Sequence, residues 1–211
     1  MIARENPFRV GRVLGLRFRP GPGGWEALSA RLESLGGRAA LVGPHGSGKT
    51  TALEDLAERL GACRWIRLNE EAREVPPGAL AGLGPGETLL VDGAEQLGRA
   101  AWRRVAAAAR RLVVTTHRPG RLPTLLETRT TPALLEGLLD ELLGEEAPGW
   151  RAAARALYRR HAGDLREVFR GLYDAAAAEV AGGSGSEKSR GVPAARLSNT
   201  AWLLKRPAGR S

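Results

Sequence analysis

The sequence has little cysteine, few aromatic residues and no long apolar run. Its one cysteine among 211 residues, Cys63, excludes an internal disulfide, and an aromatic content of 5% is ordinary for a globular protein. No window approaches the roughly 18 consecutive apolar residues that a membrane-spanning helix needs, and the first residues lack the apolar stretch of a signal peptide. We therefore expect a cytoplasmic protein that makes no membrane contact.

Lysine is also scarce, because only three of the 32 basic residues are lysines and Lys49 is the only one before residue 183. The formal net charge of +9 is unevenly distributed. Residues 183–211 hold six basic residues and one acidic residue, which leaves +4 on the rest of the chain. Most of the positive charge thus belongs to the terminal segment, and the remainder gives no strong signal for nucleic-acid binding.

Short apolar runs alternate with stretches of helical spacing in the first part of the chain. The expected strands are 38–43, 63–68, 88–92, 112–116 and 124–130. Helices are expected over 49–60 and from the end of the third strand to about residue 110. This alternation predicts right-handed crossovers and an α/β fold, in which a five-stranded parallel sheet is covered by helices. Ligands of such sheets bind outside the carboxyl ends of the strands.

Beyond Pro132 the spacing is helical only, with expected helices at 134–143, 150–161 and 165–176. A Gly/Ser-rich segment without sustained periodicity follows. We therefore divide the chain into an α/β core of residues 1–131, a small helical lid of residues 132–182 and a basic flexible tail of residues 183–211.

A phosphate-binding loop is predicted between the first strand and the first helix. The segment fits the Walker A pattern G-x-x-x-x-G-K-[ST], and it reads Gly43-Pro44-His45-Gly46-Ser47-Gly48-Lys49-Thr50. Glycines let the backbone curl so that its N–H groups point inward, and the helix N-terminus adds a positive dipole end. Lys49 would reach the β- and γ-phosphates of ATP, Thr50 would bind Mg²⁺, and Thr51 would lie near the α-phosphate. The alternative is a Gly-rich turn with Lys49 on the surface.

A second acidic ligand for Mg²⁺ is predicted at the end of the third strand, where Asp92 follows an apolar run as in a Walker B motif. In P-loop NTPases of the additional-strand class, this order of motifs places the fourth strand between the first and the third. The tip of that strand, Thr115 or Thr116, would then face the γ-phosphate. Ordinary β-branched strand residues are the alternative for both threonines.

The residue that would activate water is less clearly indicated. Gly93 stands directly after Asp92, where related hydrolases usually carry Glu, and Glu95 is the nearest carboxylate. Glu95 either acts as the general base or stabilises the first turn of a helix by its charge. Slow turnover, or binding without efficient hydrolysis, is the expectation.

On these motifs the chain resembles the AAA+ ATPases, in particular small bacterial members and the origin-recognition and transposition-regulator branches. The residues that carry the resemblance are the Walker A segment, the run 91–97 and the segment 161–166. The last resembles a sensor 2 segment, which implies that Arg166 contacts the γ-phosphate. The resemblance also implies that a stretch containing Phe8 and Val10 lies against adenine.

The chain departs from that family between the fourth and fifth strands. The link 118–123 is too short for the helix that usually carries an arginine finger, so Arg118, Arg121 and Arg129 remain as substitutes or as solvated surface residues. Ring assembly is therefore not expected, and the oligomeric state stays open.

The residues together predict an Mg-ATP binding protein with slow ATP hydrolysis, acting as a nucleotide-gated switch on a protein partner or on DNA. Two alternatives belong to other classes: a P-loop small-molecule kinase, and a nucleotide-binding interaction module that does not hydrolyse ATP. Formation of a phosphorylated metabolite would indicate the first, and affinity without phosphate release the second.

Overall fold

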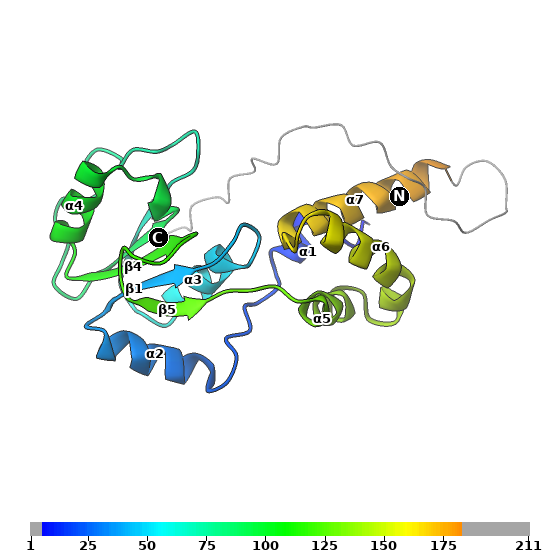
Figure 1. Cartoon of the computed structure of the whole chain (residues 1–211), viewed down its shortest axis with the longest axis horizontal. Helices are drawn as coiled ribbons and strands as arrows, with labels where there is room; N and C mark the ends of the chain where they lie inside the picture. Colours follow the sequence, from blue (N-terminus) through cyan, green and yellow to red (C-terminus); the bar gives the residue numbers. More distant parts are fainter. Residues whose placement is uncertain (1–5, 183–211) are drawn as a thin grey trace.

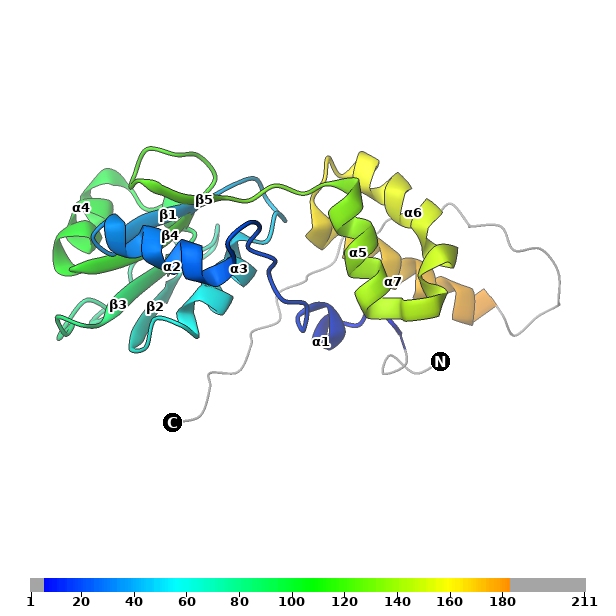
Figure 2. The same ribbon diagram turned by 90° about the horizontal axis from the view of Figure 1, so that it is seen from below.

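A computed structural model describes residues 6–182, and the predicted tail of residues 183–211 lies outside them. Figure 1 shows a sheet with helices on one side of the molecule and three helices, α5 to α7, on the other. The view from below in Figure 2 shows the same two groups, joined by the segment after β5 and by the segment after α1.

The sheet contains five parallel strands in the order β2-β3-β4-β1-β5. Their bounds are β1 Arg38–Val42, β2 Cys63–Arg67, β3 Thr88–Asp92, β4 Arg111–Thr116 and β5 Thr124–Glu127. The five-stranded parallel sheet is confirmed, and β4 lies between β1 and β3 as expected. Val42 pairs with Thr116 and Arg67 pairs with Asp92. The strand ends that carry the predicted motifs therefore lie side by side at the carboxyl end of the sheet.

Helices cover both faces of the sheet because successive strand side chains point to opposite faces. Leu89 and Val91 pack in one apolar cluster with Val105 of α4 (Arg99–Ala108). Leu90 packs in another cluster, with α2 (Gly24–Ser34) and α3 (Lys49–Ala57). All three strand residues are fully buried, as expected of strands covered on both sides.

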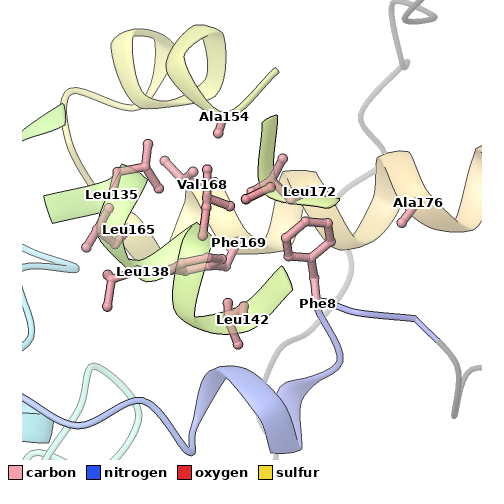
Figure 3. Close-up of a cluster of buried hydrophobic side chains, with 12 residues drawn as sticks. Phe8, Leu135, Leu138, Leu142, Ala154, Leu165, Val168, Phe169, Leu172 and Ala176 are labelled. Atoms are coloured by element: carbon pink, nitrogen blue, oxygen red, sulfur yellow. The ribbon is translucent and has the colours of Figure 1, made fainter. Parts of the chain in front are cut away.

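The helical unit has its own apolar core, drawn in Figure 3. It comprises α5 (Pro132–Leu143), α6 (Ala147–Arg160) and α7 (Leu165–Gly182). A segment from the beginning of the chain joins it: Phe8, just before α1 (Val10–Val13), is 1% exposed and packs edge-on against Trp150 at 4.9 Å. Arg12 also donates to the Leu142 carbonyl. The segment from Phe8 to Arg12 therefore packs on the helical unit, although the sequence division assigns it to the core.

Several elements differ from the expectations. The helix expected to run unbroken to about residue 110 is a short 3-10 helix, η1 (Ala94–Gln96), followed by α4, because extended Leu97 and Gly98 separate them. The fifth strand ends at Glu127 rather than at residue 130. Helix α2 was not predicted, since it buries only Leu28 and Leu32.

Candidate functional site

The phosphate-loop segment forms a tight curve between β1 and α3. Gly46 and Gly48 have φ angles of +63° and +87°, which glycine adopts without steric cost. Gly43 has no room for a side chain, since a Cβ there would overlap Thr128 and come within 2.9 Å of the Ser47 hydroxyl. Ser47 donates to the Pro44 carbonyl at 2.8 Å and shares a 2.6 Å hydrogen bond with Thr128. Glycine is thus required by both the backbone conformation and the packing.

Lys49, the first residue of α3, folds back over this loop. Its side chain is buried, and Nζ donates to the carbonyl oxygens of Gly43 at 2.7 Å and Pro44 at 2.6 Å. Burial lowers the pKa of Lys49 from its ordinary value, while the carboxylates of Glu95 and Asp92 act to raise it. The alternative of a surface lysine is thereby excluded.

Asp92 is the centre of a small hydrogen-bond network at the end of β3. Thr50 Oγ1 donates to its two carboxylate oxygens at 3.2 and 3.0 Å. Thr115 Oγ1 donates to Asp92 Oδ1 at 2.7 Å and accepts the Gly93 N–H at 2.8 Å. Thr116, buried beside it, donates to the Arg118 carbonyl at 2.9 Å instead. Of the two candidate threonines, Thr115 is therefore the one that contacts the predicted metal ligand.

Gly93 explains why no Glu follows Asp92. Its φ is +82°, and a Cβ at this position would overlap the Leu68 carbonyl oxygen and lie 3.1 Å from the Leu68 carbonyl carbon. Any side chain here therefore requires a backbone shift, so a Glu at this position is incompatible with the observed strand end.

Glu95 lies on η1 and points to the tip of β4. Its Oε1 is 3.2 Å from His117 Nε2, while its Oε2 is buried without a hydrogen-bond partner among residues 6–182. The His117 ring lies 3.9 Å from the ring of His45, which belongs to the phosphate loop. Burial lowers the pKa of His117 from its ordinary value, and the charge of Lys49 acts in the same direction against that of Glu95. The sequence placed these histidines apart, and no motif signals their contact.

A cavity of about 370 Å³ opens beside Glu95. It is lined by Glu95, Thr116 and the five residues from His117 to Arg121. Arg121 lies over the Trp102 ring at 4.9 Å, donates to the Leu97 carbonyl at 2.6 Å and has one buried nitrogen, Nη1, without a partner in the described chain. Two of the residues that line the cavity, Glu95 and Arg121, thus each carry a buried polar atom without a partner in the described chain.

The start of α7 lies against the phosphate loop. A Cβ at Gly46 would overlap the Asp164 carboxylate, which caps α7 by accepting the N–H groups of Arg166 at 2.9 Å and Glu167 at 3.3 Å. Arg166 is exposed, its guanidinium makes no hydrogen bond or ion pair within residues 6–182, and its charge acts to lower the pKa of Lys49. The segment expected to resemble a sensor 2 helix is therefore next to the loop.

The residues expected to contact adenine and the candidate arginine fingers are not shown to contact the phosphate loop in the described chain. Phe8 is buried within the helical unit and offers no free ring face there, while Val10 and Thr51 are half-buried. Arg129 pairs with Glu127 at 3.0 Å, and Arg121 is anchored in the cavity wall.

The donor set suits one magnesium ion rather than a zinc site. A hydroxyl and a carboxylate, those of Thr50 and Asp92, are already within 3.0 Å of each other, and oxygen donors are the ligands that Mg²⁺ prefers. Within residues 6–182 no three His, Cys, Asp or Glu side chains are arranged to hold a metal ion.

The helices of that range include none that is long and apolar enough to cross a membrane.

Comparisons with known proteins bear on the fold. No protein-family model and no curated protein matches the chain. Solved structures of two point mutants of RuvB from Thermotoga maritima match at TM-scores of 0.40 and 0.43, with 16% and 18% identity over 71% of this chain and 68% of theirs. NtrX from Brucella abortus, in complex with ADP, matches at a TM-score of 0.50 with 15% identity. That match covers 80% of this chain and 52% of the NtrX chain. The likeness to NtrX concerns the fold alone, and it agrees with the predicted α/β fold with a five-stranded parallel sheet. The narrower resemblance to origin-recognition and transposition-regulator ATPases stays a prediction.

Proposed function

We propose that the protein binds Mg-ATP at the carboxyl ends of β1 and β3. One observation carries this proposal. The Walker A segment and the end of β3 come together at the curved glycine loop in front of α3, and they bring Lys49, Thr50 and Asp92 to one place. Backbone N–H groups and a helix N-terminus favour phosphate there, and the buried ammonium supplies a positive charge. The shared fold with NtrX, whose structure contains ADP, also supports a nucleotide ligand.

Thr50 and Asp92 would hold Mg²⁺, which when bound neutralises phosphate charge. Lys49 would exchange the two loop carbonyls for phosphate oxygens, because an ammonium–phosphate hydrogen bond is charge-assisted and stronger than one to a neutral acceptor. Thr115 would keep the Asp92 carboxylate oriented through the bond that they already share.

Slow hydrolysis to ADP and phosphate is the proposed reaction. The oxygen of a water molecule would form the new bond to the γ-phosphorus, the bond to the bridging oxygen of ADP would break, and Glu95 would accept the proton of the water. The contact of Glu95 with His117 supports this role over the alternative of stabilising a helix end. Arg166 would stabilise the charge on the transferred group.

A switch role follows from the position of the helical unit. Asp164 lies against Gly46, so a triphosphate that enters the loop brings negative charge close to the Asp164 carboxylate and to the Arg166 guanidinium. Binding would therefore alter the contact between the loop and α7, and a protein or DNA partner would read the changed surface.

Binding of a fluorescent ATP analogue and release of phosphate test this proposal in the full-length protein. We expect Lys49→Ala and Asp92→Asn to weaken Mg²⁺-dependent binding, whereas Glu95→Gln retains binding and loses hydrolysis by roughly 10²-fold or more. Glu145→Gln, which changes an exposed carboxylate between α5 and α6, is the matched control and should behave as wild type. Equal binding by wild type and Lys49→Ala would refute the nucleotide site.

Arg166→Ala tests the lid contact, with exposed Arg160→Ala as its control. The first variant should lower the preference for ATP over ADP, and the second should not. Unchanged preference in both would remove Arg166 from the site. The same assays with duplex DNA present would show whether DNA acts as the partner.

A further inference from the structure

One carboxylate oxygen of Glu95 contacts a histidine, and the other has no partner in the described chain. Its Oε1 meets His117 Nε2 at 3.2 Å, and its Oε2 is buried without a partner in the described chain, beside the 370 Å³ cavity. We propose that His117 is a positioning residue for hydrolysis, which holds Glu95 so that Oε2 accepts the proton of the attacking water. This inference rests on the proposed function, with Glu95 as its general base.

The contact with His117 is needed because the usual position of the general base, residue 93, has no room for a side chain. Gly93 cannot carry a side chain, since its Cβ would overlap the Leu68 carbonyl oxygen. A carboxylate two residues later begins from a different point of the backbone, on η1, and needs a second contact to fix its orientation. His117 supplies that contact from β4, the strand adjacent to β3.

The protonation of His117 suits a donor role. Its neighbours with titratable groups are Glu95 on η1, Lys49 on α3 and His45 on the phosphate loop, and burial with the two basic neighbours outweighs Glu95 to lower its pKa. The lowered pKa favours the neutral imidazole of His117. With its proton on Nε2, the neutral ring would donate to Oε1 of Glu95.

The cavity offers a place for the water. Buried polar atoms are ordinarily satisfied by protein groups or by water. Arg121 Nη1 and Glu95 Oε2, the two unsatisfied atoms here, belong to residues of the same cavity wall, and the charge of Glu95 acts on the pKa of Arg121. Neither atom is exposed to solvent in the free protein, so Oε2 must become accessible when ATP binds. The attacking water would then pass its proton to Oε2 as its oxygen bonds to the γ-phosphorus and the bond to the ADP oxygen breaks.

Single-turnover hydrolysis with four variants tests the role of His117. His117→Leu removes the donor and should lower the rate between about 10- and 100-fold, since misplacement of a catalytic group by about 1 Å has effects of that size. His117→Gln keeps an N–H donor and should retain most of the wild-type rate. ATP affinity should be the same in both. In a Glu95→Gln background, His117→Leu should cause no further loss, because its effect acts through Glu95.

A His117→Leu rate equal to wild type would overturn the inference, and so would an equal loss in the Glu95→Gln background. If His117→Leu fails to fold, His117→Ala with added imidazole replaces it, and recovery of the rate by imidazole is the expected result, whereas no recovery in a folded protein would overturn the inference. The Lys49→Ala binding assay distinguishes this failure from that of the proposed function. Loss of binding in Lys49→Ala with no effect at His117 would reject the positioning role alone.

Discussion

Gly93→Ala is the substitution that best tests whether the position after Asp92 requires glycine. A non-glycine residue in the left-handed region costs about 1–2 kcal/mol, and relief of the overlap with Leu68 by a backbone shift costs a further 1–3 kcal/mol or so. The substitution should therefore lower the free energy of unfolding by about 2–5 kcal/mol. For a protein of this size the loss corresponds to a decrease in Tm of roughly 4 to 20 °C.

Two other glycines separate the contributions to this loss. Gly61 has a φ of +76° and no atom near its Cβ position, so Gly61→Ala should show the conformational cost alone, about 1–2 kcal/mol. Gly86 has neither a left-handed φ nor a close neighbour, and Gly86→Ala should leave Tm within the range of about 0.5 kcal/mol expected of a surface substitution. Thermal unfolding followed by circular dichroism compares the three variants with wild type.

The same substitution should also disturb the site. The Gly93 N–H donates to Thr115, which in turn donates to Asp92, so a shift of this peptide changes the orientation of the carboxylate. We expect weaker Mg²⁺-dependent ATP binding in the folded fraction, and Gly93→Glu should not increase hydrolysis. A Gly93→Ala variant as stable as Gly86→Ala would refute the steric account of the missing Glu.

Two further predictions concern residues outside the nucleotide site. Asp55→Ala should cost about 1–3 kcal/mol in urea unfolding, because the buried Asp55 carboxylate accepts the Phe18 N–H at 2.6 Å and the substitution leaves that donor unpaired; unchanged unfolding would show that water replaces the carboxylate. Partial burial raises the pKa of the half-buried Cys63 thiol on β2. At pH 8 Cys63 should therefore react with iodoacetamide more slowly in the folded protein than in urea, and equal rates would contradict this prediction.

The sequence determined the features that depend on local chemistry. The phosphate loop was predictable because its glycines, Lys49 and Thr50 have fixed spacing between a strand and a helix. The order of the motifs, through its resemblance to P-loop NTPases of the additional-strand class, also implied the place of β4 between β1 and β3. Asp164, whose residue type is preferred at helix N-caps, accepts the Glu167 N–H at the start of α7.

The tertiary structure decided the contacts between residues that are distant in the chain. Glu95 meets His117 only because η1 and the tip of β4 share one edge of the sheet, and Thr115 rather than Thr116 reaches Asp92 because of the strand register. Phe8 lies in the core of the helical unit, where the long separation in sequence gave no signal. Spacing fixes which residues share an element, whereas the packing of elements against one another fixes which side chains meet, and that depends on the whole chain at once.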